Sequence, residues 1–181
     1  EKLETGVKYD KSLSKYKKIV KELDSTSYFP RAKKVLPAIE KKWEEKKAEM
    51  LFAHLSKLKP VEKYDELISA IGTLRDHYSG TKLVQEKKPH LTSLTKTAIG
   101  YREKKRAEKQ FKERNFRASV QAGEEALRAN PELMEDVKPI LAVGYFNLAE
   151  NYFKNKQYTE AATDYEKWIK LSQKKESPEY E

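Results

Sequence analysis

The chain has 181 residues, of which 38% are hydrophobic and 37% are charged, and its formal net charge at pH 7 is +9. It contains no cysteine and no apolar run of about 18 residues, which excludes disulfides, thiolate metal sites and a membrane-spanning helix. The positive charge is concentrated in residues 1–60, which carry 16 basic and 9 acidic side chains, whereas residues 115–181 carry 9 and 12.

Two helices are predicted in the first third of the chain. Apolar residues at helical spacing predict one helix over 7–23, which begins just after Gly6, and a longer one over 31–58. A polar break at 24–27 separates them. We expect Pro37 to lie in the first turn of the second helix or to kink it mildly.

A short helix and a long helix are predicted next. The short one covers 64–78 and ends at Ser79-Gly80, since glycine is a common C-terminal cap. The long one begins near Thr81 or after Pro89, two alternatives that the pattern leaves open, and it ends in a turn at Arg114-Asn115.

Three helices complete the predicted set, over 116–129, 132–153 and 158–173. The middle one carries Pro139, where we expect a kink. Residues 174–181 form a polar tail.

Residues 145–171 form the most regular stretch and predict two short helices folded against each other. The polar linker 154–157 is so short that the two helices must be antiparallel neighbours. Each helix places large side chains on one face and a small residue where the backbones approach. These residues are Tyr145, Leu148, Ala149 and Tyr152 in the first helix, and Ala161, Tyr165 and Trp168 in the second.

This pattern resembles the tetratricopeptide repeat, a helix–turn–helix unit of about 34 residues. The family usually has alanine where Trp168 stands, which suggests a last, capping repeat. A weaker copy lies upstream, and Pro131 falls where the family prefers a proline to end its second helix. In this copy Ala107 aligns with Ala149, Phe116 with Tyr158, and Ser119 with Ala161.

The resemblance implies an all-α fold, an α-solenoid of antiparallel helix pairs that winds into a right-handed superhelix with lengthened first helices. We expect a single array over residues 1–173 with about three and a half repeats. The repeats are 7–24, 31–79, 81–130 and 132–173, and 174–181 is the tail. A HEAT-like array has a comparable period, but it would not require the aromatic and alanine positions. Because the chain begins with Glu1, we expect a fragment or a processed form whose first helix precedes it.

No catalytic or metal-binding pattern is present in the sequence. His54, His77 and His90 are far apart and have no partner at ligand spacing, and we expect His54 to be a core or edge residue. The six glycines do not cluster into a phosphate-binding loop. We therefore predict that the protein is not an enzyme and needs no cofactor, and the sequence does not indicate its compartment.

In the resemblance, the first helix of each repeat lines a concave groove that holds a peptide or a partner helix. Carried over position by position, the groove candidates are Tyr101, Lys104, Lys105, Glu108, Lys112, Val143, Phe146, Asn147, Glu150 and Lys154. Phe146 has two readings, packing between repeats or an anchor for the partner. We predict a non-enzymatic interaction module or scaffold that docks an acidic or amphipathic segment of another protein. One alternative is a self-assembling structural subunit that binds its own copies, and a weaker one is nucleic-acid binding through the basic run 102–106.

Overall fold

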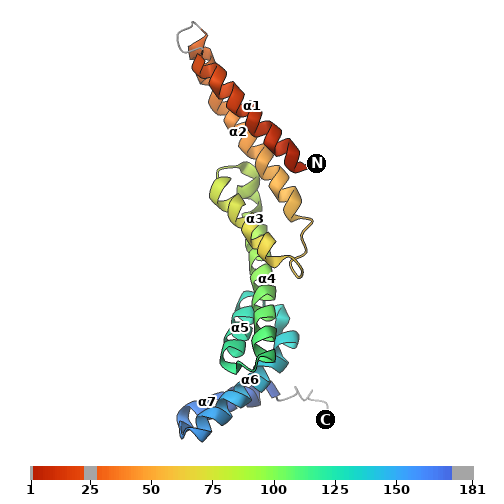
Figure 1. Cartoon of the computed structure of the whole chain (residues 1–181), viewed down its shortest axis with the longest axis vertical. Helices are drawn as coiled ribbons and strands as arrows, with labels where there is room; N and C mark the ends of the chain where they lie inside the picture. The colour runs from red at the N-terminus through yellow and green to blue at the C-terminus, as the bar shows by residue number, and fades with distance from the viewer. Residues whose placement is uncertain (1, 23–27, 173–181) are drawn as a thin grey trace, which may run out of the picture. The chain divides into compact units, whose positions relative to one another are not determined.

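The protein is helical throughout the part of the chain that the structure describes. The computed structural model describes residues 2–22 and 28–172, with side chains for residue 11 and for residues 13–22 and 28–172. These residues contain seven α-helices, one short 3-10 helix and no strand. Figure 1 labels the α-helices in chain order. The prediction of an all-α fold is therefore confirmed. The predicted break at 24–27 and the predicted tail at 174–181 lie outside the described residues.

The helices follow the predicted order, and the chain divides into two compact units. The helices are α1 (Lys2–Glu22), α2 (Phe29–Leu55), α3 (Tyr64–His77), α4 (Lys82–Lys112), α5 (Phe116–Ala129), the 3-10 helix η1 (Pro131–Leu133), α6 (Met134–Lys154) and α7 (Tyr158–Ser172). The first unit comprises Glu1–Lys59 and Glu66–Thr92, and the second comprises Pro60–Asp65 and Ser93–Glu181. The division passes through α4, which belongs to both units.

Two predicted helix boundaries are wrong. Gly6 lies inside α1 rather than before it, because one glycine costs a long helix only about 1 kcal/mol. Gly80 has no left-handed backbone and α3 already ends at His77, so glycine does not cap this helix. Pro37 lies well inside α2, which excludes the first-turn position, one of its two predicted alternatives. The start of α4 next to Thr81 is confirmed, and the Thr81 hydroxyl accepts a hydrogen bond from the Val84 N–H at 3.4 Å.

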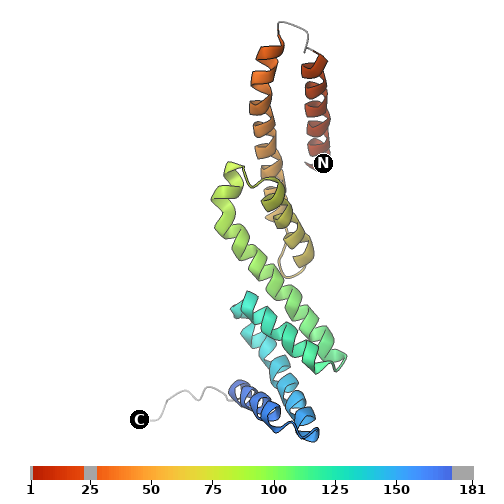
Figure 2. The ribbon, with the colours of Figure 1, turned by 90° about the vertical axis from the view of Figure 1, so that its left-hand side faces the viewer.

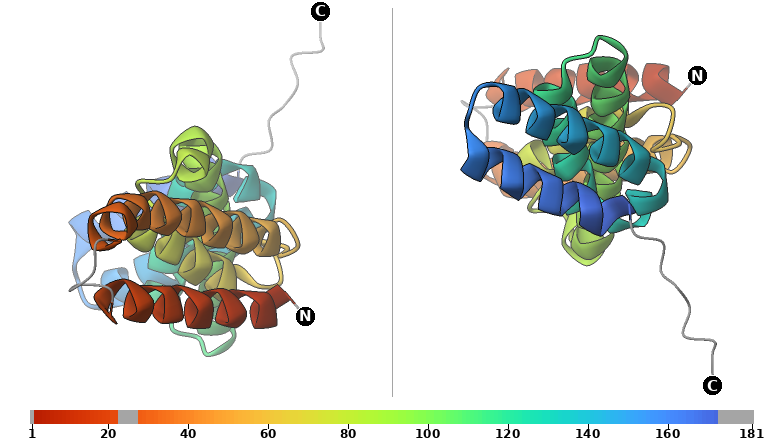
Figure 3. Two further views of the ribbon diagram at one scale, coloured as in Figure 1. Left: turned by 90° about the horizontal axis from the view of Figure 1, so that it is seen from above. Right: turned by 90° about the horizontal axis from the view of Figure 1, so that it is seen from below.

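In the first unit, α1 and α2 lie side by side and antiparallel, as Figure 2 and the left view of Figure 3 show. Two polar contacts tie the start and the first turns of α4 to the other helices. The Lys82 N–H donates to Glu45 of α2 at 2.7 Å, and Arg75 of α3 donates to Thr92 at 2.8 Å. The largest fully buried side chains come from three helices and are Leu55, Leu67, Ile71, Leu74 and Leu91.

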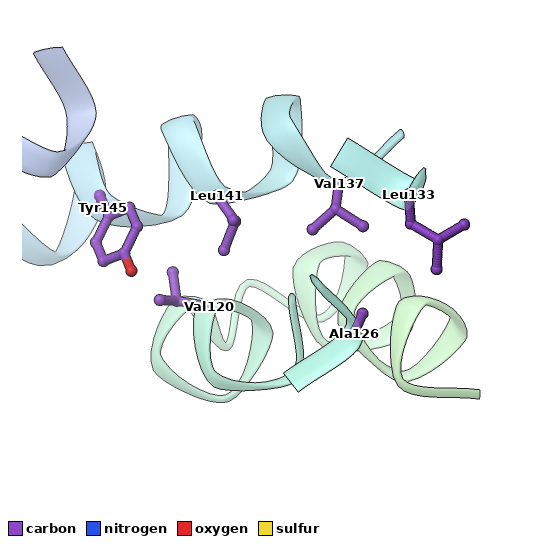
Figure 4. Close-up of a cluster of buried hydrophobic side chains, with 6 residues drawn as sticks. All are labelled: Val120, Ala126, Leu133, Val137, Leu141 and Tyr145. Atoms are coloured by element: carbon purple, nitrogen blue, oxygen red, sulfur yellow. The ribbon is translucent and has the colours of Figure 1, made fainter. Parts of the chain in front are cut away.

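The core of the second unit lies between α5 and α6 (Figure 4). Leu133, Val137, Leu141 and Tyr145 recur every four residues and therefore form one face that packs on Val120 and Ala126 of α5. Glycine allows the two backbones to approach closely. A Cβ atom at Gly144 would lie 2.5 Å from Val120 Cγ2. On the other side, α6 packs against α7, and both Ala149 and Ala161 are buried.

The turn between α4 and α5 recurs between α6 and α7, displaced by 42 residues. Each turn contains one residue with a left-handed backbone, Arg114 (φ 57°) and Lys156 (φ 61°). The next N–H donates to a carbonyl five residues back, from Asn115 to Gln110 and from Gln157 to Tyr152, both at 2.9 Å. This bond is typical of helix C-termini. An edge-to-face ring pair brackets each turn, Phe111 with Phe116 at 5.9 Å and Phe153 with Tyr158 at 5.6 Å.

Candidate functional site

The predicted groove residues form two helix faces, one on α4 and one on α6, with the same spacing. The salt bridge between Lys104 Nζ of α4 and Asp136 Oδ2 of α6, at 2.5 Å, links the two faces. Lys104 also lies 3.9 Å from Glu108, and its side chain is only 20% exposed. Two carboxylates of the protein itself therefore compete with any external carboxylate for the Lys104 ammonium group.

The remaining candidates on α4 differ in how accessible they are. Tyr101 packs partly buried against the core between α5 and α6, so it supports the fold more than it lines a surface. Lys105 is exposed and lies 3.3 Å from Glu108, a surface pair that contributes little. Lys112 is exposed, and no hydrogen bond or ion pair joins its side chain to another residue that the structure describes. A shallow depression of about 380 Å³ runs along this helix, lined by Lys105, Glu108, Lys109, Lys112 and Glu113.

On α6, two apolar candidates are exposed and two polar candidates are occupied by internal hydrogen bonds. Val143 and Phe146 are 44% and 39% exposed. The side-chain amide of Asn147 donates to the Val143 carbonyl at 2.8 Å, and Glu150 accepts a hydrogen bond from Tyr165 of α7. Lys154, at the end of the helix, is exposed.

Phe146 packs against α7 of its own hairpin and is 39% exposed, so its predicted role as an anchor for a partner stays a prediction. Its ring centroid lies 5.2 Å from that of Trp168 and 6.1 Å from that of Tyr165, both in α7. The three rings form an aromatic cluster with edge-to-face and tilted geometry, which is favourable between aromatic side chains.

Tyr145 and Tyr152 face α5, although the sequence predicted that they would pack against α7. The Tyr145 hydroxyl donates to Glu124, and Arg117 donates to the Tyr152 hydroxyl at 2.9 Å. Lys167 of α7 lies over the Tyr145 ring, 4.7 Å from its centroid. Burial, and then the hydrogen bond to Glu124, raise the pKa of the Tyr145 phenol.

The same causes raise two further pKa values in this hairpin. The hydrogen bond to Glu150 is the main reason why the pKa of Tyr165 is raised. Burial is the main reason why the pKa of Asp164 is raised, and the nearby Lys167 opposes it. The hydrogen bonds of the two tyrosines join α6 to its neighbours, since Tyr145 binds Glu124 of α5 and Tyr165 of α7 binds Glu150.

A buried carboxylate on α4 was not predicted from the sequence. Glu103 lies within the basic run 102–106, and the residue is only 5% exposed. It is bracketed by Arg102 at 3.0 Å and Arg106 at 2.8 Å. The only signal in the sequence is its position four residues before the buried Ala107. A second depression, of about 370 Å³, adjoins it and is lined by Ile99, Arg102, Glu103, Glu125, Arg128 and Ala129.

The histidines are not grouped with other potential metal ligands in the described residues. His54 is exposed and not in the core, and its Nε2 lies 3.1 Å from Glu66. Among the helices described, none is long and apolar enough to span a membrane.

Comparison with protein-family models, with curated proteins and with solved structures finds no match to this chain.

Proposed function

We propose that the hairpins α4–α5 and α6–α7 are successive repeats of a solenoid similar to the tetratricopeptide family. The recurring turn supports this proposal. At equivalent positions both turns have a residue with a left-handed backbone, a backbone hydrogen bond to a carbonyl five residues back, and an edge-to-face pair of aromatic rings. The small residues also support it. Ala107, Ala149 and Ala161 are buried where helices meet, and the buried Ser119 hydroxyl donates to the Ala107 carbonyl at 3.1 Å.

We further propose that the faces of α4 and α6 dock an acidic, amphipathic segment of another protein. The observation that carries this proposal is the exposure of Val143 and Phe146 on one face of α6. Exposed apolar side chains on neighbouring turns, within a polar surrounding, are typical of a partner-binding surface. Because Lys104 is paired internally, the charge offered to a partner comes from Lys112 and Lys154.

Phe146 and Lys104 are poor targets for a test, because both also stabilise the fold. Val143 is better suited, and Ile169 of α7 provides a matched control, since both are 44% exposed. A photo-crosslinking amino acid is placed at each position in turn. Helical peptides of equal hydrophobicity and acidic, neutral or basic charge are then added. The acidic peptide should crosslink at Val143 and not at Ile169. Equal crosslinking at both positions would refute the proposal that the peptide docks on the faces of α4 and α6.

The contribution of charge to peptide binding is tested separately, by reversing the charge at positions 112 and 154. Both are exposed, so Lys112→Glu with Lys154→Glu should leave the helix content unchanged. Surface steering of this kind is screened by salt, and we expect the variant to weaken binding of the acidic peptide about tenfold at low ionic strength. Lys96→Glu with Lys170→Glu introduces the same charge change at exposed positions off this surface. If both variants weaken binding equally, only net charge is being measured.

Self-assembly is a second candidate, supported by the last hairpin. Phe153 and Tyr158 are among its most exposed large side chains, although their rings pack on each other. A second copy stacked on this end would cover them, as neighbouring repeats do in solenoids. Light scattering over a concentration series decides the matter, because a constant monomer mass excludes assembly through this end.

A further inference from the structure

Three arginines gather at the second depression, although arginine is uncommon in this chain. Only seven of the 38 basic residues are arginine. Arg102 of α4 and Arg128 of α5 line the depression. Arg106 lies beside it, since it contacts both carboxylates of the lining, Glu103 and Glu125. A guanidinium group presents its N–H groups as a rigid fork, which suits it to planar anions better than lysine is suited.

The depression lies on the side of α4 that faces away from α6. Arg102 and Arg106 are each two residues from Lys104, and therefore about 160° away from it around the helix. Lys104 faces α6, where it pairs with Asp136. The depression is thus separate from the proposed docking faces of α4 and α6, and an inference about it does not depend on that proposal.

The protein pairs both carboxylates of the lining and leaves one guanidinium group free. Glu103 accepts from Arg102 at 3.0 Å and from Arg106 at 2.8 Å. Glu125 accepts from Arg106 at 3.4 Å. Arg128 is exposed, and it makes no hydrogen bond or ion pair with any residue that the structure describes. Three guanidinium groups and two carboxylates leave a net charge of +1, and Arg128 is the group without a partner.

Glu103 holds two of the guanidinium groups in place before any ligand binds. Arg102 contacts this buried carboxylate through Nε and Nη2, so its Nη1 is left for a ligand. Arg106 uses only Nη1, on Glu103 and Glu125, so its Nε and Nη2 are left. Side chains that are fixed in advance lose less conformational entropy when a ligand binds.

The lining favours one class of anion. Ile99 and Ala129 line the depression beside the charged groups, so a ligand with an aliphatic part fits better than an inorganic ion. The volume of about 370 Å³ is near the lower end of the range for ligand sites. A carboxylate matches the net charge, and its two oxygens fit the fork of Arg128. A phosphate monoester carries nearly two negative charges and would face Glu103 and Glu125.

We propose that this depression binds a small aliphatic monocarboxylate. Arg128 binds the two carboxylate oxygens, Arg102 Nη1 donates a further hydrogen bond, and the aliphatic chain lies on Ile99 and Ala129. An arginine cluster that only joined α4 to α5 would need Glu103 and its two partners, but it would give no role to Arg128.

The test is a titration of the full chain with sodium hexanoate, followed by proton–nitrogen correlation NMR. The Nε–H signals of Arg102 and Arg128 should shift along one saturable curve, with a Kd on the order of 1 mM, and that of Arg31 should not shift. Hexanol lacks the charge and should bind at least about tenfold more weakly. Acetate lacks most of the chain and should also bind roughly tenfold more weakly, with about half of the missing surface buried. Hexyl phosphate should bind no more tightly than hexanoate.

Substitutions of Arg128 separate its charge from its geometry. Arg128→Gln should weaken hexanoate binding about tenfold. Arg128→Lys keeps the charge but not the fork, and it should weaken binding about threefold. Arg31→Gln of α2 is the matched control, because Arg31 is also exposed and the charge change is the same. We expect it to change binding less than about twofold. Circular dichroism checks that each variant keeps its helix content.

Five results would overturn the proposal. The first is the absence of a saturable shift of the Arg128 signal with hexanoate. The others are equal binding of hexanol, equal binding of acetate, tighter binding of hexyl phosphate, and equal effects of Arg128→Gln and Arg31→Gln. The last of these would mean that the titration measures only net charge.

Discussion

The contact between α5 and α6 can be tested with a single methyl group. These helices approach at Gly144, where an added Cβ would lie 2.5 Å from Val120 Cγ2, a distance that real side chains do not tolerate. Gly144→Ala therefore forces Val120 or one of the helices to move. This contact positions α6, the helix that carries Val143 and Phe146. The substitution therefore tests whether packing against α5 keeps the candidate docking surface in place.

The magnitude follows from two opposing effects. Replacing glycine by alanine within a helix stabilises it by about 1 kcal/mol. Overpacking a closed contact costs about 1–3 kcal/mol, so we expect Gly144→Ala to lower the free energy of unfolding by up to roughly 2 kcal/mol. Gly72 of α3 is the control, because no atom lies within 4 Å of its added Cβ. Gly72→Ala should stabilise the protein by about 1 kcal/mol.

A second substitution isolates the clash. Val120→Ala removes the methyl groups that Gly144→Ala would meet, at a cost of about 1.5 kcal/mol of buried apolar surface. In that background Gly144→Ala should no longer destabilise the protein. The coupling between the two substitutions should be about 1–3 kcal/mol, since they change atoms in direct contact.

Urea unfolding provides the measurement, followed by circular dichroism and by the fluorescence of Trp168, which packs against this core. A Trp43→Phe background removes the second tryptophan signal. The reasoning is refuted if Gly144→Ala stabilises the protein as much as Gly72→Ala does. It is equally refuted if the effects of Gly144→Ala and Val120→Ala simply add.

Two further predictions concern buried polar groups. Glu103→Gln should lower the free energy of unfolding in urea by roughly 1–3 kcal/mol, because Arg102 loses its charged partner and Arg106 keeps only Glu125, at 3.4 Å. An unchanged free energy of unfolding would mean that water already screens the carboxylate. Tyr145 has a pKa raised by burial and by Glu124, so it favours the folded state below the unfolded tyrosine's value of 10.0, and this contribution is lost as the pH rises above that value. Unfolding free energies measured from about pH 9 to about pH 11 should therefore fall less steeply in Tyr145→Phe than in the wild type.

The position of most helices could be predicted from the sequence, because it depends on interactions within a few residues. Apolar spacing and capping side chains act locally, and the bounds predicted for α5, 116–129, are those observed. The two turns were also predicted in place, although their left-handed residues are arginine and lysine rather than glycine. The boundary predicted at Gly6 was wrong, since a long helix tolerates a local cost of about 1 kcal/mol, and the cap predicted at Gly80 was wrong because α3 ends earlier, at His77.

Only the tertiary structure decided which neighbour each face of a helix contacts. Tyr145 and Phe146 are adjacent aromatic residues, about 100° apart around α6, and helices with apolar faces lie on both sides of it. The sequence therefore could not tell that Tyr145 packs on α5 and Phe146 on α7. Whether Lys104 serves a partner or the fold likewise depends on Asp136, 32 residues further along the chain. Helix formation is a property of neighbouring residues, whereas the availability of a side chain for binding depends on distant ones, which no local pattern records.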